Sequence, residues 1–211
     1  MSKTYVIIPD SHAHYQHNND RAIWAGKLIN DIRPDYVVHM GDSADMPSLS
    51  SYDRGKKSFQ GRTYRADVDS HLDFNDRLWS TVKAAKKKLP YRVILEGNHE
   101  YRIKKAINLQ PELEGAIGFD DLELDQFYDK VVEYDGLYPG CITLDGISFA
   151  HYHLSGRMGY PVSGEHIAYS LITRRLGSCV VGHNHLLDYC QRSNPDERKV
   201  IGLSTGCYID Y

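Results

Sequence analysis

The stretch Tyr91-Arg92-Val93-Ile94-Leu95-Glu96-Gly97-Asn98-His99-Glu100 lies near the middle of the chain and decides how the rest of it is interpreted. Its first five residues predict a buried strand, and Gly97 predicts the turn that ends this strand. In an open α/β sheet, ligands bind at the carboxyl ends of the strands. Asn98 would offer a carbonyl oxygen to a metal there, and His99 can hold or donate a proton near neutral pH. A simple exposed turn explains this stretch equally well. The residues at the other strand ends therefore decide between a turn and a functional site.

Four further strand ends carry residues that bind metals. A helical pattern separates the first two strands, which predicts parallel β-α-β connections and one shared edge for the strand ends. The motifs are Asp10-Ser11-His12 after the run Thr4–Pro9, Gly41-Asp42 after Tyr36–Met40, His151-Tyr152-His153 after Ile147–Ala150, and Gly182-His183-Asn184-His185 after Ser178–Val181. Structural histidines scattered through a chain would not be expected to follow successive strands so regularly.

Composition predicts one globular domain over residues 1–211. A chain of this length with 41% hydrophobic residues can bury a full core. The net charge of −3 disfavours a broad electrostatic grip on nucleic acid, although a local basic patch remains open. The four cysteines form no Cys-x-x-Cys pair, and we expect them to be buried thiols of a reducing compartment. No apolar run suffices for a signal peptide or a membrane span, so we expect a cytoplasmic chain without a membrane partner.

The remaining sequence predicts crossover helices in the first half and hairpins in the second. Asp145-Gly146 is a strong two-residue hairpin signal. The predicted helices run from Asn19 or Asp20 to Arg33, from Val68 to Ala85, over Ile103–Ile107, over Asp121–Phe127 and over Ile167–Ile172. Residues 46–64 are expected to form a polar loop. From Lys130 onward, short apolar runs alternate with turn residues, which is typical of hairpins. The closing strands are expected at Val200–Leu203 and Cys207–Ile209. The run Lys86–Lys88 is interpreted as a solvated helix end, with nucleic-acid contact as the minority alternative.

The types of ligand residue indicate which metals the site would take. Imidazole and carboxylate ligands together suit zinc, manganese or iron better than magnesium alone. The predicted ligands are too many for a single ion, so we expect two divalent metal ions. A two-metal site needs a bridging carboxylate, and such a pair clamps the attacking and the leaving oxygen of a displacement at phosphorus.

The five motifs together resemble the ordered signature of the calcineurin-like metallophosphoesterases. That signature is Asp-x-His, Gly-Asp, Gly-Asn-His-Asp/Glu, a lone His after a strand, and Gly-His-x-His, and here it spans residues 10–185. The resemblance implies a four-layer α/β/β/α sandwich and a metal-bridging hydroxide as the nucleophile. It also implies the metal ligands: Asp10, His12 and His185 at one ion, Asn98, His151 and His183 at the other, and Asp42 as the bridge. His99 would stabilise the transition state or protonate the leaving oxygen.

The chain departs from this family at the lone histidine, which is usually followed by glycine. Here Tyr152 follows His151, and a second histidine stands at position 153. In an extended segment His151 and His153 face the same side, so either can reach the metal. His151 is preferred because it lies directly at the strand end, and His153 is then a candidate to line the substrate pocket. Arg102 is either a phosphate clamp or a charge on a helix surface.

The leading hypothesis is a dinuclear metal-dependent hydrolase of a phosphomonoester or phosphodiester. The expected substrate is a phosphorylated small molecule or a nucleotide-like compound, seated in part by Lys56 and Lys57. The segments 46–65, 101–129 and 152–165 are expected to set specificity, because the small chain leaves no room for a separate capping domain. The alternatives are a metal-dependent nuclease and a non-catalytic protein-binding scaffold. The complete ligand set argues against the scaffold.

Overall fold

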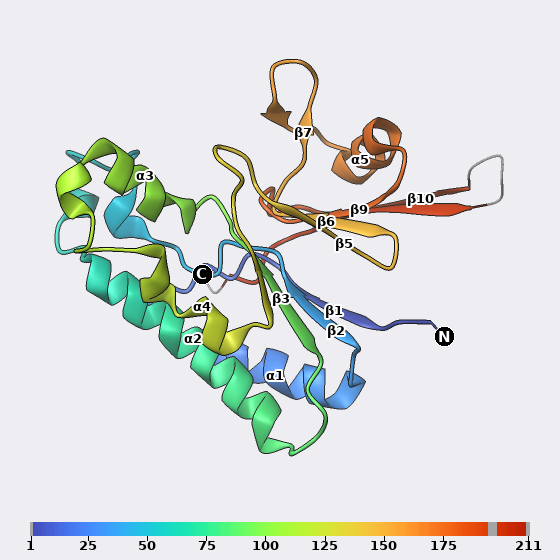
Figure 1. Ribbon diagram of the computed structural model, residues 1–211, viewed down its shortest axis with the longest axis horizontal. Coiled ribbons are helices and arrows are strands. Elements are labelled where there is room, and N and C mark those ends of the chain that lie inside the picture. The colour runs from blue at the N-terminus through green and yellow to red at the C-terminus, as the bar shows by residue number, and fades with distance from the viewer. Residues whose placement is uncertain (1, 194–197, 210–211) are drawn as a thin grey trace.

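The computed structural model describes residues 2–193 and 198–209 and places their strands in three sheets (Figure 1). The strands are β1 (Tyr5–Ile8), β2 (Tyr36–His39), β3 (Tyr91–Leu95), β4 (Lys130–Val132), β5 (Cys141–Leu144), β6 (Ile147–Ala150), β7 (Leu154–Ser155), β8 (Tyr160–Pro161), β9 (Ser178–Val181), β10 (Leu187–Ser193) and β11 (Lys199–Thr205). The α-helices are α1 (Asp20–Ile32), α2 (Tyr64–Ala84), α3 (Tyr101–Leu109), α4 (Leu124–Phe127) and α5 (Ile167–Arg175). Short 3-10 turns cover Pro47–Leu49, Lys57–Phe59, Pro111–Leu113 and Phe119–Leu122.

The first sheet is parallel throughout, in the order β1-β2-β3-β4. Helix α1 connects β1 to β2 and α2 connects β2 to β3, and both helices cover the same face of the sheet (Figure 1). This is the predicted β-α-β arrangement. Because all four strands run in one direction, the loops that follow β1, β2 and β3 leave the sheet at the same edge.

The second sheet is mixed, in the order β10-β11-β9-β6-β5. Strands β5 and β6 form the predicted hairpin, and both turn residues, Asp145 and Gly146, have positive φ, as a type I′ turn requires. Strand β9 lies parallel to both of its neighbours, β6 and β11. The loops after β6 and β9 therefore also leave at a common edge.

Three hydrophobic clusters hold these elements together. The largest lies between the first sheet and helices α1 and α2 and contains Trp79 and Phe74. A second joins the two sheets, because Val38 and Val93 of the first sheet pack with Phe149 and Val180 of the second. A third lies under α5, between Ile167 and Leu171 of the helix and Cys179 and Val181 of β9. The fold is thus mixed α/β, with one parallel and one mixed main sheet.

Several sequence-based expectations were wrong at the level of single elements. Strand β4 joins the parallel sheet rather than the hairpin-rich half. The predicted helix from Asp121 to Phe127 is interrupted at Glu123, whose φ is +48°. Residues 207–209 form no strand beyond a single bridge from Cys207 to Asp10. Strand β10 was not expected.

Two further expectations concerned thiols and membranes. All four cysteines are free, but among them Cys179 alone is buried, and Cys141 is exposed. The expectation of buried thiols was therefore wrong for the other three: Cys141 and Cys190 lie on edge strands of the second sheet, and Cys207 lies beyond the last strand. Among the described residues no helix combines the length and the apolar content needed to cross a bilayer.

Candidate metal centre

The loops that follow β1, β2, β3, β6 and β9 meet at one place, and backbone hydrogen bonds tie them together. The N–H groups of Ser11 and His12 both donate to the carbonyl oxygen of Asp42, at 3.2 and 2.8 Å. The N–H of His183 donates to Oδ2 of Asp10 at 2.8 Å, and the N–H of Gly182 donates to the carbonyl of His151 at 3.0 Å. The strand ends of both sheets are thereby held in one constellation.

Three groups of side chains in this constellation are able to hold a metal ion, each with its ligand atoms within 4.8 Å of one another. The groups are Asp10, His12 and His185; His12, Asp42 and His99; and Asp42, His151 and His183. The carboxylate of Asp42 belongs to two of them, with its Oδ2 3.7 Å from His12 Nε2 and 3.4 Å from His151 Nε2. The predicted amide ligand is close by, because Oδ1 of Asn98 lies 3.0 Å from His151 Nε2.

Four of the predicted ligands have backbone conformations that residues other than glycine rarely adopt. The φ angles of His12, Asp42, His183 and His185 are +44°, +49°, +67° and +55°. Each costs free energy and persists only where the surroundings enforce it, and such residues cluster at functional sites. Here the left-handed residues turn the side chains of successive loops toward one point.

Two glycines allow the loops to approach this closely. A Cβ at Gly97 would overlap the backbone nitrogen and Oδ1 of Asp42, and a Cβ at Gly182 would overlap Oδ1 of Asp10. Both glycines stand in the sequence motifs quoted above. Their function is therefore to leave room for the two carboxylates.

Hydrogen bonds on the outer side of the imidazoles orient the inner nitrogens. Nδ1 of His151 lies 2.8 Å from the carbonyl oxygen of Met40, and a carbonyl only accepts, so Nδ1 carries a proton and Nε2 faces Asp42. Nδ1 of His12 lies 3.0 Å from Oδ1 of Asp45, which directs its Nε2 inward in the same way. Such outer contacts fix the tautomer of metal-binding histidines.

The electrostatics of the cluster favour positive charge at its centre. Burial alone would raise the pKa of Asp42, but His151 and His99 hold this pKa well below its usual range. Burial would lower the pKa of His151, but Asp42 raises it to about 10. A metal ion bound to both groups would compete with a proton on His151. Burial lowers the pKa of His183 to about 4, which keeps its ring neutral, as a ligand must be.

The residues present fit a divalent cation. Oδ1 of Asp10 is buried and has no hydrogen-bond partner, which is costly for a carboxylate unless a cation approaches it. The Nε2 atoms of His12 and His185 lie only 3.2 Å apart. Because both nitrogens also lie beside the carboxylate of Asp10, the three side chains are placed as ligands to one ion would be.

His99 is held differently from the other imidazoles. The backbone N–H of His99 donates to Oδ1 of Asp42 at 2.8 Å, and Nδ1 of its ring lies 2.6 Å from the carbonyl oxygen of Asp45. Its Nε2 lies 2.9 Å from Nη2 of Arg102, whose Nη1 also donates to the carbonyls of Asp45 and Met46. Arg102 is thus not an isolated surface charge, because its guanidinium contacts His99, and its role as a phosphate clamp stays a prediction.

Glu100 was quoted in the central motif but was given no function from the sequence. Its buried carboxylate accepts hydrogen bonds from the N–H groups of Asp42, Gly97 and Ala44. It therefore fixes the backbone of the Gly-Asp loop against the Gly-Asn-His loop. The sequence signal for this role was the position of Glu100 as the acidic residue that ends the Gly-Asn-His-Glu motif.

The remaining candidates lie apart from the cluster. His153 is buried, and its Nε2 lies 3.3 Å from the hydroxyl of Ser148, because the chain bends at His151 instead of staying extended. Lys56 and Lys57 are exposed on the loop before α2, where Lys56 pairs with Asp53. Neither contacts a predicted metal ligand in the part of the chain that the structure describes.

Comparison with known proteins agrees with this geometry. The sequence profile described as calcineurin-like phosphoesterase matches residues 3–198, nearly the whole chain. The chain belongs to this family. As a calcineurin-like phosphoesterase it resembles the gene 54 proteins of the mycobacteriophages D29 and L5, with 28% and 26% identity over 88% of this chain and 70% of each relative. No solved structure matches the chain significantly.

Proposed function

We propose that this calcineurin-like phosphoesterase is a dinuclear metal-dependent hydrolase of phosphomonoesters or phosphodiesters. The observation that carries the proposal is the position of Asp42, whose carboxylate is shared by two groups of potential metal ligands. A shared carboxylate is what a pair of neighbouring ions requires. We assign Asp10, His12 and His185 to one ion, Asn98, His151 and His183 to the other, and Asp42 to both.

The chain's own residues prepare the site before any substrate arrives. Asp45 and the carbonyl of Met40 orient His12 and His151, and Glu100 holds the loop that carries Asp42. When bound, manganese, iron or zinc ions would supply Lewis-acid chemistry at phosphorus and activate water. We infer that His99 donates a proton to the leaving oxygen or a hydrogen bond to the transition state. Because Nε2 accepts from Arg102 in the free chain, it must release Arg102 and take up a proton before it donates, while the carbonyl of Asp45 positions the ring through Nδ1.

The finer description of the fold is part of the same proposal. We infer the four-layer α/β/β/α order of the family, which is supported by α1 and α2 packing on the first sheet, α5 packing on the second, and a hydrophobic cluster between the sheets. We also place the chain in a cytoplasmic, reducing compartment, which its four free cysteines support.

Three tyrosines next to the centre support a nucleotide-like substrate. Tyr152 follows His151, and its ring centroid lies 4.8 Å from the ring of His183. The hydroxyl of Tyr134 donates to that of Tyr152 at 3.3 Å, and the ring of Tyr134 stacks on Tyr101 with centroids 4.5 Å apart. All three rings are half-buried and so keep part of their surface in solvent. A partly exposed aromatic wall beside the reacting phosphate suits the base of a nucleotide.

We predict that Tyr152→Ala raises the KM for AMP about 5- to 150-fold, because stacking on a base contributes about 1–3 kcal/mol. The KM for ribose 5-phosphate, which carries the same phosphate without a base, should change less than about twofold. Steady-state kinetics on both substrates measures the effect. If the protein hydrolyses phosphodiesters instead, the same comparison uses a dinucleotide and its abasic counterpart. Tyr152→Phe, which keeps the ring, should resemble the parent. Equal losses on both substrates would contradict a role in base recognition.

The nuclease alternative depends on the basic loop before α2. Two of its charges are already paired within the chain, since Arg62 and Lys56 both pair with Asp53, and Arg65 in the first turn of α2 pairs with Asp69. This favours a short substrate over a long polyanion, for which unpaired cations along a track are needed. Lys56 and Lys57 remain candidates for seating such a substrate.

A substrate screen with added manganese tests the proposed function. The parent should hydrolyse generic phosphomonoesters or phosphodiesters, and EDTA should abolish the activity. Asp42→Asn, purified in parallel, controls for contaminating phosphatases. Degradation of long DNA with binding that falls steeply with salt would favour the nuclease instead. Absence of hydrolysis in a chain fully loaded with metal would favour the scaffold.

A further inference from the structure

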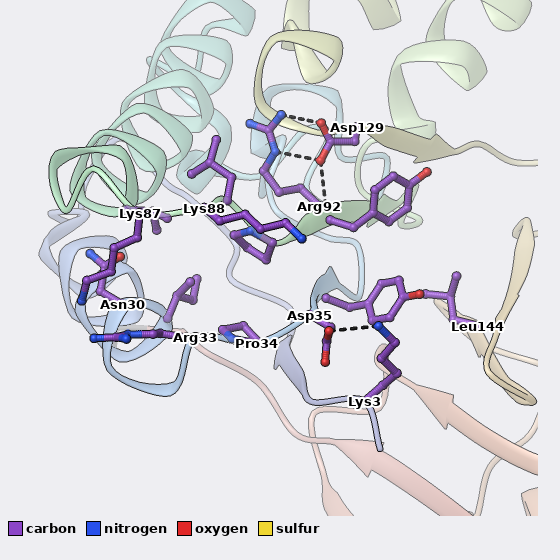
Figure 2. Close-up of a pocket in the computed structure, with 16 residues that line it drawn as sticks. Lys3, Asn30, Arg33, Pro34, Asp35, Lys87, Lys88, Arg92, Asp129 and Leu144 are labelled. Carbon is purple, nitrogen blue, oxygen red and sulfur yellow. Dashed lines mark hydrogen bonds and ion pairs between the residues drawn. The ribbon is translucent and has the colours of Figure 1, made fainter. Parts of the chain in front are cut away.

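A cavity lies at the opposite edge of the first sheet from the metal centre. It has a volume of about 1020 Å³ and is bordered by the last residues of α1, the segment after α2, and the first residues of β2 and β3 (Figure 2). The metal ligands follow the far ends of these strands. A strand of four or five residues spans about 13–17 Å, so the two sites are separate.

The charges that line this cavity are unbalanced. Five cationic side chains face two carboxylates: Lys3, Arg33, Lys87, Lys88 and Arg92 against Asp35 and Asp129. Both carboxylates are already engaged, because Asp35 accepts from Lys3 Nζ and from the N–H of Thr4, and Asp129 accepts three hydrogen bonds from Arg92. A chain with a formal charge of −3 thus gathers an excess of positive charge in one cavity.

Three cations lack such partners. Within residues 2–193 and 198–209, the charged groups of Arg33, Lys87 and Lys88 make no hydrogen bond or ion pair that the structure shows. Figure 2 shows Arg33 and Lys87 at one end of the cavity, with Lys88 extending toward its middle. Cations at a helix end complement the helix dipole, which explains their presence near α1 and α2. The dipole does not explain why all three line one hollow. Each is also exposed to solvent, and an anion bound in the hollow would pair with them.

Apart from Asn30, the rest of the lining is apolar and aromatic. Leu89 is half-buried, Ile29 and Val82 are almost fully buried, and Tyr91, 43% exposed, offers part of its ring. The volume exceeds what a single phosphate ion fills and lies in the range of cavities that hold small organic ligands. A ligand that satisfies both halves of this lining carries several negative charges on a planar, partly apolar body.

We propose that this cavity binds a nucleoside polyphosphate, with its phosphates at Arg33, Lys87 and Lys88 and its base beside Tyr91. The site is independent of the metal centre and of the reaction assigned to it. It also gives a function to two of the three lysines in the run that follows α2.

The proposal is tested by titrating ATP into the metal-free chain in EDTA, with calorimetry as the readout. Saturable binding is expected, and Lys87→Glu and Lys88→Glu should each weaken it about tenfold or more, because each reverses a charge that faces phosphate. Lys86→Glu is the matched control, since Lys86 belongs to the same run but does not line the cavity. Its dissociation constant should stay within about twofold of the parent's.

A second probe separates the base from the phosphates. Tripolyphosphate should bind about tenfold more weakly than ATP, because it lacks the base. Equal affinities for the two probes would overturn the nucleotide assignment. Equal binding by all three lysine variants, or no saturable binding by the parent, would overturn the site, and the lysines would then be a solvated helix end. Tighter binding of duplex DNA than of ATP, lost in the same two variants, would replace the nucleotide with a nucleic-acid backbone.

Discussion

Asp42→Asn should abolish hydrolysis and weaken metal binding more than about 100-fold. Removal of an outer partner of a metal ligand alone costs about 10- to 100-fold in affinity, and Asp42 is assigned to both ions. The substitution removes the charge that offsets two dications while the side chain keeps its size. Metal content by elemental analysis and turnover on the best substrate of the screen measure the two effects.

A buried carboxylate outside the centre provides the matched control. Asp67 on α2 is equally buried and accepts a hydrogen bond from the N–H of Ser48, but it belongs to none of the three ligand groups. Asp67→Asn should therefore keep its metal and its turnover. If Asp42→Asn retained two ions and near-normal turnover, the bridging assignment would be wrong.

His99→Ala should lower turnover by about 10²- to 10⁴-fold and leave metal content unchanged, because general acid catalysis contributes a factor of this size without holding the ion. The contacts of His99 distinguish it from the residues assigned as metal ligands. His99 Nε2 lies 3.9 Å from Oδ2 of Asp42 but only 2.9 Å from Arg102, so its inner nitrogen already has a partner within the chain.

The control for His99→Ala is His17→Ala, which removes an exposed imidazole from the loop after β1. That variant should match the parent in turnover, metal content and melting temperature. Loss of metal in parallel with turnover in His99→Ala would make His99 a ligand, as its membership of one of the three groups permits.

The sequence predicted the strand ends well because parallel strands have simple rules. Buried strands are short apolar runs, their carboxyl ends share an edge, and Asp10, Asp42 and Asn98 each follow such a run. Strand β10 escaped notice because its residues, Leu187–Ser193, are mostly polar and exposed, as befits a strand at the edge of a sheet.

Contacts between side chains of distant loops were much harder to predict. The carboxylate of Glu100 holds the loop of Asp42, and Arg102 contacts His99, but both depend on the direction in which a side chain leaves its loop. The choice between His151 and His153 depended on whether the chain stays extended after β6, and it bends there. The stack of Tyr134 on Tyr101 joins two elements that no local pattern connects.

A pair of metal ions bridged by Asp42 has a direct test in the metal stoichiometry of the chain. The chain is stripped with chelator, reloaded with manganese, freed of excess metal and analysed for manganese and protein together with turnover. We expect about two ions per chain, with turnover rising as the second ion binds. Full turnover at a single ion per chain, or no retained metal, would contradict it.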